Sequence, residues 1–136
     1  MRKLGFILAL IVAASLAACG GEPAPAGGGG GAAGGDTGAG EAVFDQGTIG
    51  GLPGCMTCHS LEAGVMLVGP SLANIGAEAG SMVSGLSAEE YLRQSIVEPN
   101  AYVVEGVGQG LMPVGYGDAL SSQQLDDLVA YLLSLK

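Results

Sequence analysis

Two cysteines and the only histidine of the chain lie within five consecutive residues, Cys55-Met56-Thr57-Cys58-His59. Two thiols separated by two residues and followed by histidine form the pattern of covalent c-type haem attachment. The spacing suits this chemistry because one turn of chain can bring both thiols to the two vinyl groups on one edge of the porphyrin. The histidine is then held under the ring centre, where a nitrogen can bind iron. The motif therefore predicts one covalent haem c on Cys55 and Cys58, with His59 as an iron ligand.

Two other kinds of site also use a pair of cysteines two residues apart. Such pairs occur in thioredoxin-like redox sites and as half of a zinc site. A structural zinc site needs four ligands, and beyond this cluster only Cys19 could add a sulfur or nitrogen ligand. A thioredoxin-like site expects a βαβ context, and the sequence has no alternating strand pattern. Haem attachment is therefore the preferred interpretation.

The first 18 residues have the pattern of a secretory signal peptide. Arg2 and Lys3 precede an apolar run over residues 4–12 and a tract of small residues over 13–18. The apolar run is too short to span a bilayer as a free helix. The sequence Leu-Ala-Ala-Cys at residues 16–19 resembles a bacterial lipobox, which implies removal of residues 1–18 and lipidation of Cys19. An ordinary signal peptide followed by an incidental cysteine, or an uncleaved anchor, is the alternative.

The composition changes abruptly after Cys19. Residues 20–40 contain 11 glycines in 21 positions, together with two prolines and several alanines. Such a segment cannot bury a core, so residues 19–40 are predicted to be a lipidated cysteine and a flexible linker. The remaining residues, 41–136, have the length of one domain.

One helix is predicted just before Pro99. Ser87 and Glu90 fit a capping box at its start, and the proline marks its end. Glu89 and Arg93 are four residues apart with the acid first, a favourable surface pair on a helix. The apolar residues of this helix recur on one face: Ala88, Leu92 and Ile96.

Two further helices are predicted at the ends of the domain. Residues 41–46 form a short first helix with Phe44 facing inward, and Ser121 or Ser122 caps the last helix. The last helix has an apolar face and a polar face, composed respectively of Leu125, Leu128, Val129 and Leu132, and of Asp126, Asp127 and Ser134. The domain is thus predicted to be all-α with long glycine-rich connections. Its few aromatic residues leave a small core, which a buried haem would enlarge.

Several motifs in residues 41–136 together resemble the small monohaem class I cytochromes c. Besides the C-x-x-C-H motif, they are Val68-Gly69-Pro70-Ser71-Leu72, Leu111-Met112-Pro113 and a C-terminal amphipathic helix containing Tyr131. Residues 90–104 are similar to cytochrome c domains fused to oxidase subunit II. The resemblance implies three or more short helices wrapped around one covalent haem. It also implies that the first and last helices cross, with Phe44 and Tyr131 as candidates for the contact.

The resemblance further implies a set of haem-contacting residues. Met112 matches the family's second axial ligand of the iron, because it precedes a proline in a glycine-flanked loop just before the last helix. Met66 and Met82 are the alternatives, since a methionine is often only core filler. Pro70 matches the proline whose carbonyl accepts a hydrogen bond from the ligating histidine. Arg93 and Tyr102 are candidate partners of the haem propionates.

Charge limits the partners of the chain. Removing residues 1–18 leaves two basic residues against 13 acidic ones, a net charge of −11. A basic patch for nucleic acid or anionic lipid is therefore excluded. A redox partner that is steered electrostatically should be basic, and an apolar patch around an exposed haem edge is the other mode of docking.

These features predict an electron carrier rather than an enzyme. The expected protein is lipid-anchored at Cys19 on the extracytoplasmic face of a bacterial membrane and passes single electrons between redox partner proteins. The alternatives are a haem-based sensor or weak peroxidase with a labile sixth ligand, and a fixed haem subunit of a membrane redox complex.

Overall fold

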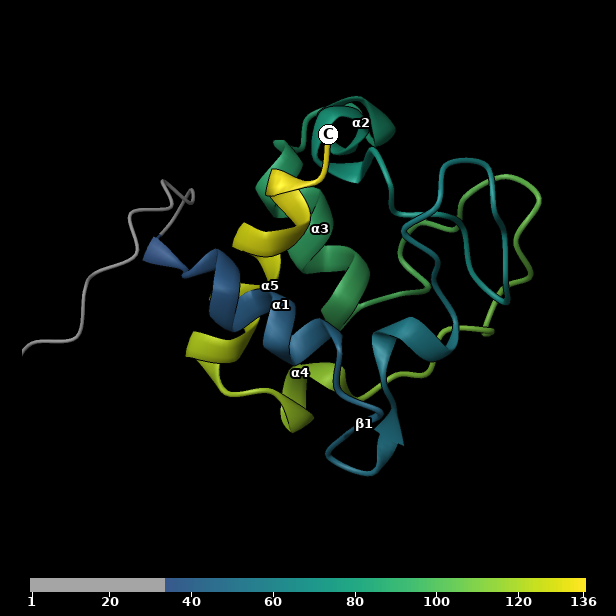
Figure 1. The fold of residues 1–136 in the computed structure, drawn as a ribbon. Helices are drawn as coiled ribbons and strands as arrows, with labels where there is room; N and C mark the ends of the chain where they lie inside the picture. Colours follow the sequence, from purple (N-terminus) through teal and green to yellow (C-terminus); the bar gives the residue numbers. More distant parts are fainter. Residues whose placement is uncertain (1–33) are drawn as a thin grey trace, which may run out of the picture.

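The computed structural model describes residues 34–136, which form five α-helices, one short 3-10 turn and a two-stranded hairpin (Figure 1). The predicted signal segment, Cys19 and most of the predicted linker lie outside the described residues. In chain order the elements are α1 (Thr37–Phe44), β1 (Thr48–Ile49), β2 (Leu52–Pro53), η2 (Cys55–Thr57), α2 (Ile75–Met82), α3 (Ala88–Val97), α4 (Tyr116–Ala119) and α5 (Ser122–Ser134). The mostly helical prediction is confirmed. Within residues 34–136 no helix has the length and apolar character needed to cross a membrane.

Helix α1 begins four residues earlier than predicted. Asp36 is its N-cap, and the Asp36 side chain accepts a hydrogen bond of 2.7 Å from the backbone N–H of Ala39. The start at residue 41 was therefore wrong, and the helix begins inside the stretch predicted as linker. A glycine-rich sequence has low helix propensity, but here the cap and the packing against α5 outweigh it.

Helices α1 and α5 cross in close contact, as predicted. The rings of Phe44 and Tyr131 lie 5.5 Å apart between centroids, and Phe44 is fully buried. Gly40 lets the two backbones approach, because a Cβ at this position would overlap the carbonyl oxygen of Asp127. The aromatic pair therefore stabilises the crossing, and the lack of a side chain at Gly40 allows the two helices to come this close.

Asp127 is buried, contrary to its predicted place on the polar face of the last helix. Its Oδ1 accepts hydrogen bonds of 2.8 Å from the backbone N–H of Asp36 and from Nε2 of Gln123. A buried carboxylate needs such partners to offset its lost hydration. The bond to Asp36 ties the entry of α1 to the middle of α5.

The predicted capping box of α3 is present, and of the two serines predicted as possible caps of the last helix, Ser121 is the N-cap. Ser87 and Glu90 cap α3, which ends at Val97 before Pro99, and Ser121 with Gln124 caps α5. The predicted pair of Arg93 and Glu89 is present at 3.4 Å. These short-range signals fixed the starts of both long helices correctly.

A small hairpin fills the glycine-rich stretch after α1, where no strand was predicted. Strands β1 and β2 pair antiparallel, with Ile49 opposite Leu52. The two residues between them, Gly50 and Gly51, have φ values of 56° and 87°. Positive φ at both central residues is the requirement of a type I′ turn, which glycine meets without strain. The hairpin places the buried Ile49 beside the cavity described next.

Candidate haem site

An apolar cavity separates the helices from two long loops. Its walls include Ile75 of α2, Leu92 and Ile96 of α3, and Leu128 and Leu132 of α5. The loops that close it are residues 60–74, between η2 and α2, and residues 98–115, between α3 and α4. Figure 1 shows both loops on the same side of the molecule, away from the crossing of α1 and α5.

Cys55 and Cys58 lie at one wall of the cavity, at the start and just after the end of η2. The tight turn is closed by a backbone hydrogen bond of 2.9 Å from the N–H of His59 to the carbonyl of Cys55. Both thiols are free and partly exposed, and burial raises the pKa of the Cys55 thiol. One turn therefore presents two thiols and an imidazole to the same cavity.

His59 is held in one orientation by the loop that follows it. Its Nδ1 donates a hydrogen bond of 2.9 Å to the carbonyl oxygen of Pro70, as predicted for this pair, because a carbonyl can only accept. The proton on Nδ1 leaves the lone pair on Nε2 available to a metal. Burial lowers the pKa of the imidazole, and the hydrogen bond to Pro70 opposes that change. The neutral form that a metal ligand requires is favoured.

Gly69 lies directly against the His59 ring, a contact that sequence reasoning missed. A Cβ on Gly69 would lie 2.6 Å from Cε1, 2.9 Å from Nδ1 and 3.0 Å from Nε2 of the imidazole. Gly69 is fixed in turn by a hydrogen bond of 2.8 Å from its N–H to the carbonyl of Cys58. A side chain at this position must therefore displace the ring.

We expect Gly69→Ala to tilt the His59 ring and lengthen its hydrogen bond to Pro70. Overpacking of a fixed site costs about 1–3 kcal/mol of unfolding free energy. NMR of the haem-loaded protein should show shifted His59 ring signals, and urea titration should show a lower midpoint. Gly47→Ala is the control for the change from glycine to alanine, because nothing lies within 4 Å of a Cβ there and its φ is not positive. Unchanged His59 signals in Gly69→Ala would contradict the contact.

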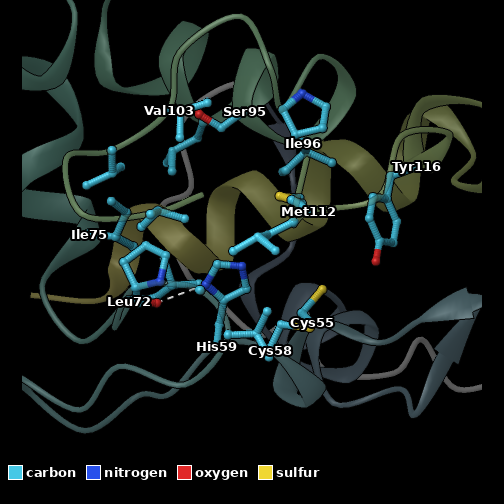
Figure 2. Close-up of a pocket in the computed structure, with 18 of the residues that line it drawn as sticks. Cys55, Cys58, His59, Leu72, Ile75, Ser95, Ile96, Val103, Met112 and Tyr116 are labelled. Carbon is cyan, nitrogen blue, oxygen red and sulfur yellow. Dashed lines mark hydrogen bonds between the residues drawn. The ribbon is translucent and has the colours of Figure 1, made fainter. Parts of the chain in front are cut away.

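The three candidate methionine ligands differ in their position relative to the cavity. Met112 and Met82 both line the cavity, whereas Met66 does not line it and is 55% exposed. Figure 2 shows His59, Cys58 and Cys55 along one side of the cavity and Met112 along the opposite side, next to Ile96. The geometry therefore brings Met112 and His59 to facing walls, while Met82 comes from the end of α2.

The two predicted propionate partners have different positions. Tyr102 lines the cavity and packs edge-on against Tyr91, with centroids 5.9 Å apart. Arg93 does not line the cavity. Its Nη2 lies 2.7 Å from Oδ1 of Asp126 and bridges α3 to α5. The guanidinium of Arg93 thus pairs with an acid on the last helix, and its contact with a haem propionate stays a prediction.

Tyr116 is a cavity residue that the sequence did not single out. Its hydroxyl donates a hydrogen bond of 2.7 Å to the carbonyl of Pro53 in β2, and its ring lines the cavity near Cys55. Burial is the main cause that raises the pKa of this phenol. The residues around Tyr116 in the sequence do not indicate that its hydroxyl has a hydrogen-bond partner 63 residues away.

The residues present suit a haem better than a zinc ion. Within residues 34–136 no three histidine, cysteine or acidic side chains are grouped to hold a metal ion. A haem needs only the two thiols, one axial nitrogen and an apolar slot, and the cavity supplies each of these. The sulfur of Met112 on the facing wall adds a soft donor of the type that haem iron accepts.

A comparison with protein families gives one match. The family described as Cytochrome c matches residues 38–136, which is nearly the whole described chain. No curated protein matches the sequence.

Proposed function

This chain belongs to the cytochrome c family, and on that premise we propose that it is a membrane-tethered, extracytoplasmic carrier of single electrons. Its fold is the all-α class I cytochrome c fold that the sequence predicted. Members of the family bind haem c covalently, and Cys55 and Cys58 are positioned for that attachment. Cytochrome c domains are typical electron carriers, so haem-based electron transfer follows from the family.

The observation that carries the proposal is the pair of facing donors. His59 offers Nε2 from a ring fixed by Pro70 and Gly69, and Met112 offers a thioether from the opposite wall. The bound haem supplies reversible one-electron exchange at its iron. His59 and Met112 would both hold the iron, which would leave it no open coordination site for a substrate. The walls of the cavity are mostly apolar.

Three measurements on the purified protein test this function. Acid–acetone extraction should leave the haem on the polypeptide, and a redox titration should follow a one-electron curve. Carbon monoxide added to the ferrous protein should cause no spectral change, because Met112 would hold the sixth position of the iron. Rapid binding of carbon monoxide would instead favour a small-ligand sensor or weak peroxidase.

We also propose that Cys19 carries the lipid that tethers the domain. The sequence at residues 16–19 and the glycine-rich segment after it support this proposal. Two acyl chains are enough for stable membrane attachment, whereas one gives only reversible binding.

We expect the wild type, expressed with its own leader, to fractionate with membranes. Intact mass should exceed the sequence mass from Cys19 onward by acyl chains plus one haem. Cys19→Ser should appear as a soluble protein without acyl mass but with haem still bound. A wild type that begins at another residue and carries no acyl mass would refute the anchor.

We propose that the redox partners of this protein include a membrane oxidoreductase complex. The similarity of residues 90–104 to cytochrome c domains fused to oxidase subunit II supports this assignment. Co-purification after mild detergent extraction separates a fixed subunit, which stays with its complex, from a tethered carrier, which elutes alone.

A further inference from the structure

The exposed apolar side chains of this protein are concentrated on the two loops that close the cavity. Within residues 34–136, eight of the ten exposed large apolar side chains belong to these loops. Four are consecutive in the first loop, with exposed fractions of 38–55%: Val65, Met66, Leu67 and Val68. Leu111 in the second loop is 49% exposed. Contiguous exposure of this kind marks an interaction surface rather than chance.

We name these five residues the loop face. Val68 and Leu111 also line the cavity, so the loop face borders its mouth. Residues 63–74 and 106–115 contain no charged side chain, although residues 34–136 hold 12 acidic residues. Glu62 and Glu105 flank these stretches and are exposed. The two uncharged stretches are thus each preceded in sequence by an exposed acidic residue, and we take these two acids as the rim of the loop face.

Basic residues are absent from this surface. The two basic residues of the described chain are Arg93, bound to Asp126 and Glu89, and the terminal Lys136. A partner with an acidic border would meet only like charge here, and a second copy of the chain from Cys19 onward would bring a net charge of −11. Both occupants are therefore disfavoured.

We propose that the loop face docks a redox protein whose contact surface is apolar at the centre and bordered by lysine or arginine. This inference rests on the proposed electron-carrier function. Contact between the loop face and the apolar centre of the partner's surface excludes water and brings the cavity mouth close to the partner. Charge complementarity at the rim mainly raises the association rate.

The entry of the chain into the domain is compatible with this docking. Asp36 is bonded to Asp127 of α5, and α1 begins on the side of the molecule away from the two loops (Figure 1). An anchor that precedes residue 34 therefore joins the domain at a point remote from the loop face. A tethered molecule can present this face to a partner.

NMR mapping with a basic probe protein tests the proposal directly. The ¹⁵N-labelled, haem-loaded ferrous chain is titrated at low salt with a ferrous mitochondrial-type cytochrome c, chosen for its lysine-rich docking face. With both proteins reduced, no electron passes and only binding is observed. Amide shifts should be confined to residues 63–70 and 105–114. Shifts confined to the outer surfaces of α1 and α5, or no shifts at all, would overturn the proposal.

Surface variants separate the apolar and charged contributions. Met66→Ser with Leu67→Ser, two side chains outside the cavity, should weaken the probe's binding about tenfold, since each loses roughly half of a buried side chain's contribution. Val97→Ser changes an exposed apolar residue of α3 outside the loops and should leave Kd within about twofold. Equal weakening by both changes would contradict a specific loop face.

The charged rim has its own matched pair of variants. Glu62→Gln with Glu105→Gln should weaken binding at low salt but not at high salt, because salt screens exposed charges. Glu41→Gln with Asp45→Asn removes the same charge from the α1 region, remote from the loops, and should change binding less. The same weakening by both pairs would show that only net charge matters and would overturn the predicted rim.

Failure of docking is distinguishable from failure of the electron-carrier function. Hexaammineruthenium(II) gives one electron to the ferric chain and becomes hexaammineruthenium(III), without needing a protein surface. If this small reagent reduces the wild type and the loop-face variant equally, the carrier function stands whatever the mapping shows. If it reduces neither, the carrier function itself is wrong.

Discussion

Met112→Ala is expected to convert an electron carrier that does not bind carbon monoxide into a protein that does. The change removes the thioether that faces His59 across the cavity and opens that position to water or an added ligand. Loss of a soft ligand that favours ferrous iron should lower the reduction potential on the order of 0.1 V, within the range over which axial ligands tune haem. The weak far-red band of a ferric iron–thioether bond should disappear, while the haem stays covalently attached.

Met82→Ala and Met66→Ala are the matched controls. Met82 also lines the cavity, so its loss should cost at most a few kcal/mol in packing, about the value for a buried methionine. Met66 is half exposed and should cost less. Both variants should keep the far-red band and remain unreactive toward carbon monoxide. Survival of the band in Met112→Ala, with its loss in either control, would assign the ligand to the other methionine.

Gly40→Ala is expected to destabilise the fold by about 3 kcal/mol, although alanine is the better helix former. The new Cβ would overlap the carbonyl oxygen of Asp127 and would lie 2.7 Å from the Cβ of Tyr131. Neither atom is the end of a flexible side chain, so α1 must move away from α5. Far-UV circular dichroism in a urea titration should show a lower midpoint.

Gly38→Ala is the control on the same helix. Its only near neighbour is the carboxylate oxygen Oδ1 of Asp36, at 3.3 Å from the new Cβ. The substitution should change the unfolding free energy by no more than about 1 kcal/mol, the difference in helix propensity between glycine and alanine. Equal midpoints for the two variants would mean that α1 and α5 do not approach as closely as described.

The features that were predictable from sequence are those with local chemical signals. The capping box at Ser87 and the serine cap of the last helix, predicted at Ser121 or Ser122 and found at Ser121, place two helix starts because a side chain bonds a backbone group three residues away. The attachment motif places both thiols and His59 within one turn because the three residues lie within five consecutive positions. The bond from His59 to Pro70 spans only 11 residues and was anticipated through family resemblance.

The features that sequence reasoning missed depend on distant partners. The entry of α1 has a local cap at Asp36 and is also tied to Asp127, 91 residues away, and the guanidinium of Arg93 is tied to Asp126. Both acids looked like solvated members of a polar helix face. Gly69 and Gly40 looked like loop and linker glycines, because the atoms that exclude a side chain come from other segments. A single sequence gives no sign of which glycines face such atoms.

The junction of Asp36 with Asp127 also decides where a mechanical load enters the domain. If residues before 34 are fixed to a membrane, any drag on the domain pulls first on the entry of α1. That pull is resisted by the hydrogen bond to Asp127, by the close approach at Gly40 and by the rings of Phe44 and Tyr131. The turn that carries Cys55, Cys58 and His59 comes only after this crossing along the chain. In a tethered domain, the crossing of α1 and α5 would therefore take up such a pull before it reached the turn that carries the two cysteines and His59.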